Sequence, residues 1–138
     1  MVSDPVLALP NLEEPLEVEV DASDYAIGGV LVQKDHLVAF ESRKLNGAEI
    51  RYTTQKKELM AVVHCLRAWR HYLLGSRFVV RTDNVAVSHI FTQPKISARQ
   101  ARWQEFLAEF DFQFEHKAEK KNPVSYTHLR AHETLSDL

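Results

Sequence analysis

Alternating apolar and polar positions mark the first regular segment of the chain. Apolar residues alternate with glutamates from position 16 up to Asp21, which predicts a half-buried strand. After a tight turn at 22–25, residues 27–33 predict a second strand, in which Gly28-Gly29 indicates a bulge or a close backbone approach. Lys34-Asp35 predicts a further turn into a third strand at 36–41. The first third of the chain is therefore expected to form a three-stranded meander.

The hydrophobic period then changes to that of a helix. Apolar residues recur on one face from Thr54 to about Leu74, with Thr53 or Thr54 as the N-cap and Gly75 as the stop. The remaining pattern predicts a strand at 78–81, a short helix from Asp83 to about Phe91, a helix from Ser97 to about Glu109, and a strand at 110–115. With the long helix as a crossover, strands one and four lie parallel. The expected fold class is α/β, with a five-stranded mixed sheet that joins an antiparallel meander to parallel strands.

Composition adds limits rather than chemistry. A chain of 138 residues with 45% hydrophobic and 26% charged residues suits one globular domain with a real core. A net charge of -2 excludes binding of nucleic acid by bulk attraction, so any such contact needs local basic patches. The single Cys65, the lack of an apolar stretch of about 20 residues and an N-terminus unlike a signal peptide lead us to expect an intracellular, cytoplasmic domain with no membrane partner.

Three acidic residues fall at related places in this predicted order. Asp21 ends strand one, Asp83 follows strand four, and Glu58 lies near the start of the long helix, on the margin of its apolar face. Residues beyond the carboxyl ends of neighbouring parallel strands share one crevice. Converging carboxylates repel one another unless a metal ion compensates, and hard oxygen ligands suit Mg²⁺ or Mn²⁺. The pattern therefore predicts a candidate metal site.

Each acid also has a simpler interpretation, and these stay open at this point. Asp83 precedes a predicted helix and suits an N-cap. Glu58 in a first turn complements the helix dipole, although no basic residue stands three or four positions away to form a surface ion pair. Asp21 has the same parity as the two glutamates before it, which fits the solvated side of an edge strand.

Longer blocks of sequence carry a family resemblance. The segments VEVDASDYAIGGVLVQ (18–33), AFESRKLNGAE-RYTTQKKELMAVVHCLRAWRHYLLGSRFVVRTDN (39–84) and ARWQEFLAEFDFQFE (101–115) closely resemble the RNase H domain of gypsy-type retrotransposon reverse transcriptases. The likeness covers about residues 4–122, with several separate blocks in order at family spacing. It implies a lead-in at 1–15 that resembles the polymerase connection, an RNase H-like domain at 16–122, and a tail at 123–138 outside the family pattern.

The resemblance implies a function and a site. Asp21, Glu58 and Asp83 match the first three acids of a four-acid site that hydrolyses the RNA strand of an RNA–DNA hybrid with two Mg²⁺ ions, for which Mn²⁺ can substitute. We expect substrate contacts from Ser23, Asn84, Arg99 and Arg102. The implied partners are the hybrid and the polymerase domain of a parent polyprotein, and the implied location is a virus-like particle in the cytoplasm.

The C-terminal end departs from the family pattern. The family continues with a segment like N-x-V-A-D-A-L-S-R, whose aspartate is the fourth acid. Here Asn122 and Val124 fit, but Ser125 and Tyr126 stand in place of the Ala and Asp. The abrupt switch indicates a fusion scar, vector-derived sequence or a frame error, and too few apolar residues follow for the tail to dock as a stable helix. Two functions stay open: an endonuclease impaired by loss of the fourth acid, and a non-catalytic remnant that binds nucleic acid weakly at most.

Other candidate chemistry is weaker. His128 and His132 have i,i+4 spacing but no third ligand for zinc, and His64, Cys65 and His71 lack a paired cluster elsewhere. Trp69 and Trp103 fall on apolar faces and are expected in the core. Basic residues form two predicted helical stripes, Lys95 with Arg99 and Arg102, and Arg67 with Arg70, His71 and Arg77. Such stripes are usually solvated faces, and in the setting of the resemblance they become candidates for phosphate contacts.

Overall fold

A computed structural model describes residues 13–83 and 97–117 of the chain. Within these ranges the elements are β1 (Leu16–Ala22), β2 (Ala26–Gln33), β3 (His36–Lys44), η1 (Glu49–Arg51), α1 (Thr54–Ala68), α2 (Arg70–Leu73), β4 (Arg77–Thr82), α3 (Ala98–Leu107) and β5 (Asp111–His116). The short helix expected from Asp83 to Phe91, most of the lead-in at 1–15 and the tail at 123–138 lie outside the described residues.

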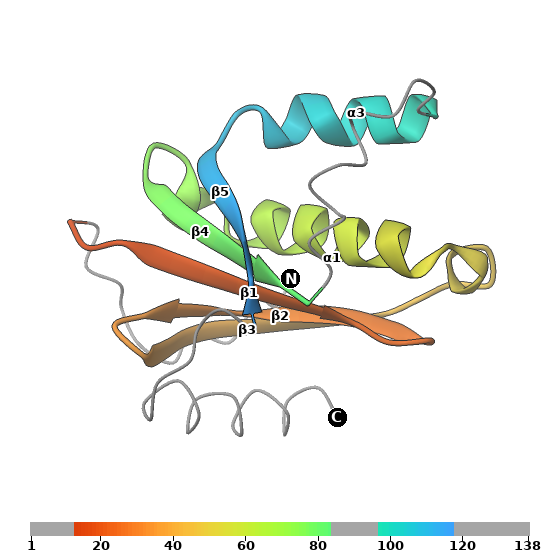
Figure 1. Cartoon of the computed structure of the whole chain (residues 1–138), viewed down its shortest axis with the longest axis horizontal. Coiled ribbons are helices and arrows are strands. Elements are labelled where there is room, and N and C mark those ends of the chain that lie inside the picture. The colour runs from red at the N-terminus through yellow and green to blue at the C-terminus, as the bar shows by residue number, and fades with distance from the viewer. Residues whose placement is uncertain (1–12, 84–96, 118–138) are drawn as a thin grey trace.

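The strands form one mixed sheet in the order β3-β2-β1-β4-β5. β1 pairs antiparallel with β2 and parallel with β4, and β4 pairs parallel with β5. α1 and α3 lie on the same side of this sheet (Figure 1). The expected α/β class and the five-stranded mixed sheet are confirmed. The edge-strand interpretation of Asp21 is wrong, because β1 is the central strand.

The meander is held by a tight turn and by a close approach of helix and sheet. Lys34 and Asp35 both have positive φ, 51° and 61°, as a two-residue hairpin turn requires. A Cβ on Gly29 would stand 2.7 Å from the Sγ atom of Cys65 in α1. The glycine therefore allows the helix to approach the sheet. The register shift between β2 and β3 lies elsewhere, between Leu31 and Val32, and not at Gly28-Gly29.

α1 begins where the sequence predicts and ends earlier. The hydroxyl of Thr53 accepts a hydrogen bond from the backbone N–H of Lys56, which caps the helix. The single helix expected as far as Leu74 is wrong, since Trp69 leaves helical geometry at φ −107° and ψ 21° and a separate turn, α2, follows. Trp69 is fully buried, so packing of its ring in the core, and not a local breaker, accompanies the break.

The core lies between the sheet and the helices. It joins the apolar residues of β1, β2 and β4 to the inner face of α1 and to Trp103, Leu107 and Phe110 at α3. Ser97 caps α3 by a capping box with Gln100. Both tryptophans are buried, as expected. Asp21 stands near the end of β1, Asp83 directly after β4, and Glu58 in the first half of α1.

Candidate active site

The parallel pairing of β1 and β4 brings two aspartates to one edge of the sheet. Glu19 pairs with Arg81 in the register of these strands, so continuing the register by two residues brings Asp21 level with Asp83. Asp21 is half-buried inside β1, whereas Asp83 directly follows β4 and is exposed. The edge formed by the carboxyl ends of parallel strands is the usual place for ligands in α/β sheets.

Glu58 enters this edge from α1 and is almost fully buried, with 4% of its surface exposed. Its Oε1 atom accepts a hydrogen bond of 3.0 Å from the hydroxyl of Thr82, the last residue of β4. The pKa of Glu58 is raised to about 7, mainly by burial and to a smaller extent by the charges of Asp21 and Asp83, against the lowering effects of Lys117 and the Thr82 hydrogen bond. Glu58 therefore faces the sheet, and its charge is coupled to both aspartates.

Lys117 is a fourth charged residue at this edge, and the sequence patterns did not single it out. It directly follows β5, whose last residue, His116, pairs with Thr82 of β4. A ring nitrogen of His116 lies 2.9 Å from the carbonyl oxygen of Asp83. The Lys117 Nζ lies 3.9 Å from Oδ2 of Asp83, and the lysine side chain is 5% exposed. An amino group points into the acidic edge instead of into solvent.

The side chains at this edge fit a divalent cation in donor type and in charge. Carboxylate oxygens are the ligands that Mg²⁺ and Mn²⁺ prefer. The buried ammonium of Lys117 lies beside these carboxylates, which is where their negative charge favours a cation. Within residues 13–83 and 97–117, no three His, Cys, Asp or Glu side chains are grouped closely enough to hold a metal ion as they stand.

Ser23 lies in the turn after β1 and has a structural role there. Its hydroxyl donates to the carbonyl of Ala26 and accepts from the N–H of the same residue, both at 3.1 Å. The Nζ of Lys57 donates to the carbonyl of Asp24 at 3.2 Å, which ties this turn to α1. The exposed Ser23 thus sits in a braced turn two residues from Asp21. Asn84, the neighbour of Asp83, lies outside the described residues.

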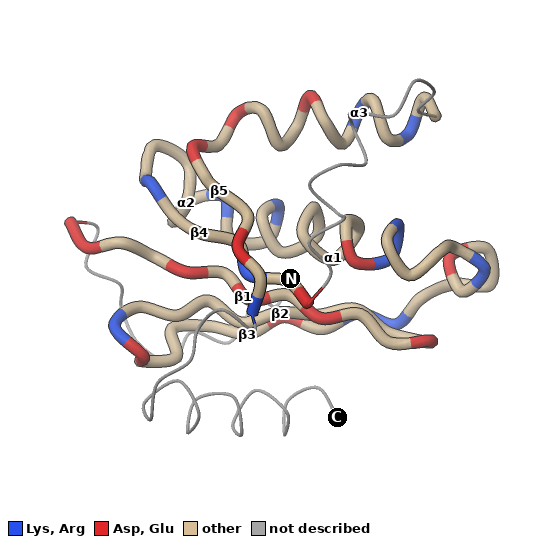
Figure 2. The backbone as a smooth tube through the Cα atoms, in the orientation of Figure 1, with Lys and Arg blue, Asp and Glu red and all other residues tan. Residues whose placement is uncertain are grey.

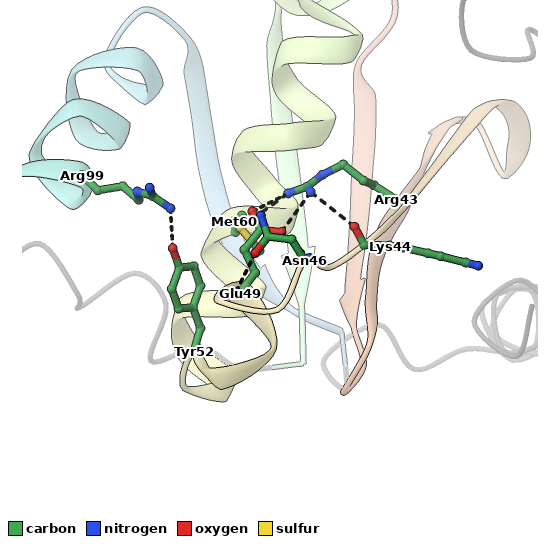
Figure 3. Close-up of polar contacts among 7 residues, drawn as sticks. All are labelled: Arg43, Lys44, Asn46, Glu49, Tyr52, Met60 and Arg99. Atoms are coloured by element: carbon green, nitrogen blue, oxygen red, sulfur yellow. Dashed lines mark hydrogen bonds and ion pairs between the residues drawn. The ribbon is translucent and has the colours of Figure 1, made fainter.

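The two arginines expected to contact substrate are both exposed on α3. The guanidinium of Arg99 donates a hydrogen bond to the hydroxyl of Tyr52 (Figure 3). The ammonium of Lys56 lies 4.1 Å from the centre of the Tyr52 ring. Arg99 therefore links α3 to the segment that precedes α1. No described contact engages Arg102 in a comparable link.

Two residues of the other predicted basic stripe, Arg70 and Arg77, have acidic partners within the protein. Acidic and basic residues are interspersed along the chain (Figure 2). Arg70 pairs with Glu109 at 3.1 Å, and Arg77 pairs with Asp111 at 3.2 Å. The sequence interpretation missed these partners because they lie more than thirty residues away. Two residues considered as metal ligands also have structural roles: a ring nitrogen of His64 lies 3.2 Å from a carboxylate oxygen of Glu41, and Cys65 is buried in the core.

Comparisons with known proteins place the chain in a family. Residues 11–110 match the sequence profile of the RNase H-like domain found in reverse transcriptase. The chain is 35% identical over 125 residues to a Drosophila melanogaster protein, the retrovirus-related Pol polyprotein from transposon 297, with 91% of this chain and 12% of that protein covered. It is 33% identical over 135 residues to the transposon Tf2-3 polyprotein of Schizosaccharomyces pombe, with 91% and 10% covered. The chain thus spans about a tenth of the length of these relatives.

Solved structures share the fold at lower identity. The foamy viral protease-reverse transcriptase in complex with an RNA/DNA hybrid matches with a TM-score of 0.68 and 19% identity, over 82% of this chain and 16% of that one. RNase H1 from Halobacterium salinarum matches with a TM-score of 0.58 and 23% identity, over 90% and 99%. None of the described helices is long and apolar enough to cross a membrane. The chain belongs to the RNase H-like domains of reverse transcriptases, in the branch of the gypsy-type retrotransposon polyproteins.

Proposed function

We propose that this domain is a metal-dependent endonuclease that hydrolyses the RNA strand of an RNA–DNA hybrid, with Asp21, Glu58 and Asp83 as its acidic residues. The observation that carries the proposal is the coupling at one sheet edge. A buried Glu58, whose pKa burial and the two aspartates raise to about 7, meets the ends of β1 and β4. The fold imposes a cost when it buries this carboxylate among like charges, and such costs cluster at functional sites.

The residues of the edge have separable tasks in this proposal. Thr82 donates to Glu58 and fixes the direction of its carboxylate. Asp21 is held in β1 by its pairing with Gly28 of β2, whereas the side chain of Asp83 is 68% exposed and faces solvent, from which substrate would approach. When bound, a pair of Mg²⁺ ions would supply an activated water and stabilise the charge on the departing oxygen. In this proposal the protein side chains position the metal ions and the phosphate that is cleaved, and they neutralise charge. None of them becomes a covalent nucleophile.

Nucleic acid would approach this edge over the turn that carries Ser23 and along the exposed face of α3 that carries Arg99 and Arg102. The relatives are polyproteins of transposons, and one similar structure is that of a viral reverse transcriptase with an RNA/DNA hybrid. We therefore propose that the domain works beside a polymerase domain. With a net charge of -2, such a domain gains from a partner that holds the hybrid.

A second function, a non-catalytic remnant, is favoured by one specific observation. Tyr126 stands where the family pattern has its fourth acid. A two-metal site with one carboxylate fewer holds its second ion poorly against hydration, and the loss is expected to slow cleavage about a thousandfold or more. The chain would then fold as an RNase H-like domain and bind hybrid weakly.

Cleavage of a labelled hybrid in Mg²⁺ separates these functions. We would compare the chain as it stands with a repaired chain that carries Ser125→Ala, Tyr126→Asp, Thr127→Ala, His128→Leu and Leu129→Ser. The repaired chain should cleave much faster, and adding Asp83→Asn to it should abolish cleavage. Asp111→Asn in the repaired chain is the matched control, because Asp111 is an exposed acid paired with Arg77. Equal cleavage rates for the chain as it stands and the repaired chain would refute the role given to position 126. Inactivity of the repaired chain when it is assayed together with the polymerase domain of its parent polyprotein would favour the non-catalytic remnant.

A further inference from the structure

Lys117 has an unusual environment for a lysine. Its side chain is 5% exposed, while Asp83, to which its Nζ lies at 3.9 Å, is 68% exposed. A buried ammonium is costly unless acidic groups or hydrogen bonds compensate for lost water. The lysine stem therefore runs under the surface with its charge at the inner side of Asp83, rather than along the surface with its charge in solvent.

The position of Lys117 follows from the sheet and not from chance contact. His116 pairs with Thr82 across the parallel strands β5 and β4, so the next residues on each strand, Lys117 and Asp83, leave the sheet side by side. The His116 ring contact to the Asp83 carbonyl, at 2.9 Å, fastens this junction. The Lys117 charge also lowers the pKa of Glu58 against the effect of burial. The Lys117 ammonium therefore interacts electrostatically with two acids, the exposed Asp83 and the buried Glu58.

We propose that Lys117 is an internal counter-cation of the acidic edge, which occupies the place of metal charge in the metal-free protein and has to withdraw when a divalent cation binds. The inference rests on the proposed function, because it assumes that Asp83 and Glu58 are ligands. An ammonium and a divalent cation cannot both sit a few ångströms from the same carboxylates without strong repulsion.

Thermodynamic linkage gives the proposal a measurable consequence. If metal and ammonium compete for the same acids, removal of the ammonium strengthens metal binding and weakens the metal-free fold. Lys117→Met keeps an unbranched apolar side chain and removes the charge, while Lys117→Arg keeps a cation. Lys57→Met is the matched control, because Lys57 is also buried but its Nζ donates to the carbonyl of Asp24.

The first experiment measures the Mn²⁺ dissociation constant by titration calorimetry at one fixed pH, together with the midpoint of thermal unfolding in EDTA. Lys117→Met should bind Mn²⁺ about tenfold more tightly than the unaltered chain and melt at a lower temperature without metal. Lys117→Arg and Lys57→Met should keep the original dissociation constant. Equal or weaker Mn²⁺ binding by Lys117→Met, compared with the unaltered chain, overturns the proposal. In that case the proposed function survives as long as the unaltered chain itself binds Mn²⁺. If neither protein binds Mn²⁺, both the inference and the assignment of the acids are wrong.

A second measurement needs no variant and covers the case in which Lys117→Met does not fold. Lysines of the unaltered chain are reductively methylated for a short time, with and without Mg²⁺, and each site is quantified by mass spectrometry. Lys117 should be protected without metal and several times more reactive with it, since it leaves its buried place. Lys57 should stay protected in both samples. Unchanged protection of Lys117 at a Mg²⁺ concentration that saturates the site would overturn the exchange.

Discussion

Replacing Glu58 by glutamine removes a charge that the fold keeps almost fully buried. The pKa of Glu58 is raised from its ordinary 4.5 to about 7, first by burial. The folded protein therefore holds this proton more tightly than the unfolded chain does. As pH rises from below 4.5 to above 7, the unfolded chain ionises first, and the free energy of unfolding falls.

The size of the effect follows from the same two values. At about 1.4 kcal/mol per pKa unit, the rise from 4.5 to about 7 corresponds to about 3 kcal/mol of lost stability above pH 7. Glutamine has nearly the same shape and can still accept the hydrogen bond from Thr82. We therefore expect Glu58→Gln to stabilise the metal-free domain by about 2–3 kcal/mol at pH 8 and by much less at pH 5.

Urea unfolding at pH 5 and pH 8 in EDTA measures this difference. Glu105→Gln is the control, because Glu105 lies on the exposed surface of α3 and should behave alike at both pH values. A stabilisation by Glu58→Gln that is the same at both pH values would refute the reasoning, because a buried charge would then not be its source. A loss of stability at pH 8 would mean that partners of the Glu58 carboxylate offset the cost of burying it.

Three further predictions concern the packing and the ion pairs around the site. Gly29→Ala should lower the free energy of unfolding by about 1–3 kcal/mol in a urea titration, because the new Cβ would stand 2.7 Å from both Sγ of Cys65 and the carbonyl oxygen of Glu19; an unchanged midpoint would contradict this close packing. Burial raises the pKa of the Cys65 thiol, so iodoacetamide should label it at the rate of global unfolding, and fast labelling of the native protein would contradict the packing. Arg43 makes hydrogen bonds of 3.0 and 3.1 Å to the carboxylate of Glu49 and lowers its pKa; this stability is present above the unfolded pKa of the glutamate and is lost as pH falls through the lowered value. Arg43→Met should therefore cost about 2 kcal/mol at pH 7 and less in acid, and equal losses at both pH values would exclude the charge as the cause.

Local sequence determined the elements because hydrophobic periodicity and caps act over a few residues. The alternation before Asp21 gave a strand, and the helical period after Thr53 gave α1 with the expected cap. Lys34-Asp35 gave the turn of the hairpin. The acids were predicted to share an edge because topology follows from the order of the elements. The three-residue helix η1 was missed, although Asn46 and Glu49 have the reciprocal spacing of a capping pair and bond to each other at 2.9 Å.

The tertiary structure decided what depends on partners far away in the sequence. α1 ends at Trp69, whose ring is buried in the core, although no glycine or proline stands there. Arg70 and Arg77 look like a free basic face until Glu109 and Asp111 pair with them.

The acidic edge shows the same division between local and distant causes. The sequence placed Glu58 near the start of a helix, but only packing against β4 made it a buried carboxylate bonded to Thr82. Lys117 follows a strand and would ordinarily be a solvated lysine. The parallel register of β4 and β5 turns it toward Asp83 instead. Periodicity reports which side of an element is apolar, whereas the charge and pKa of a side chain depend on the groups that the whole fold brings around it.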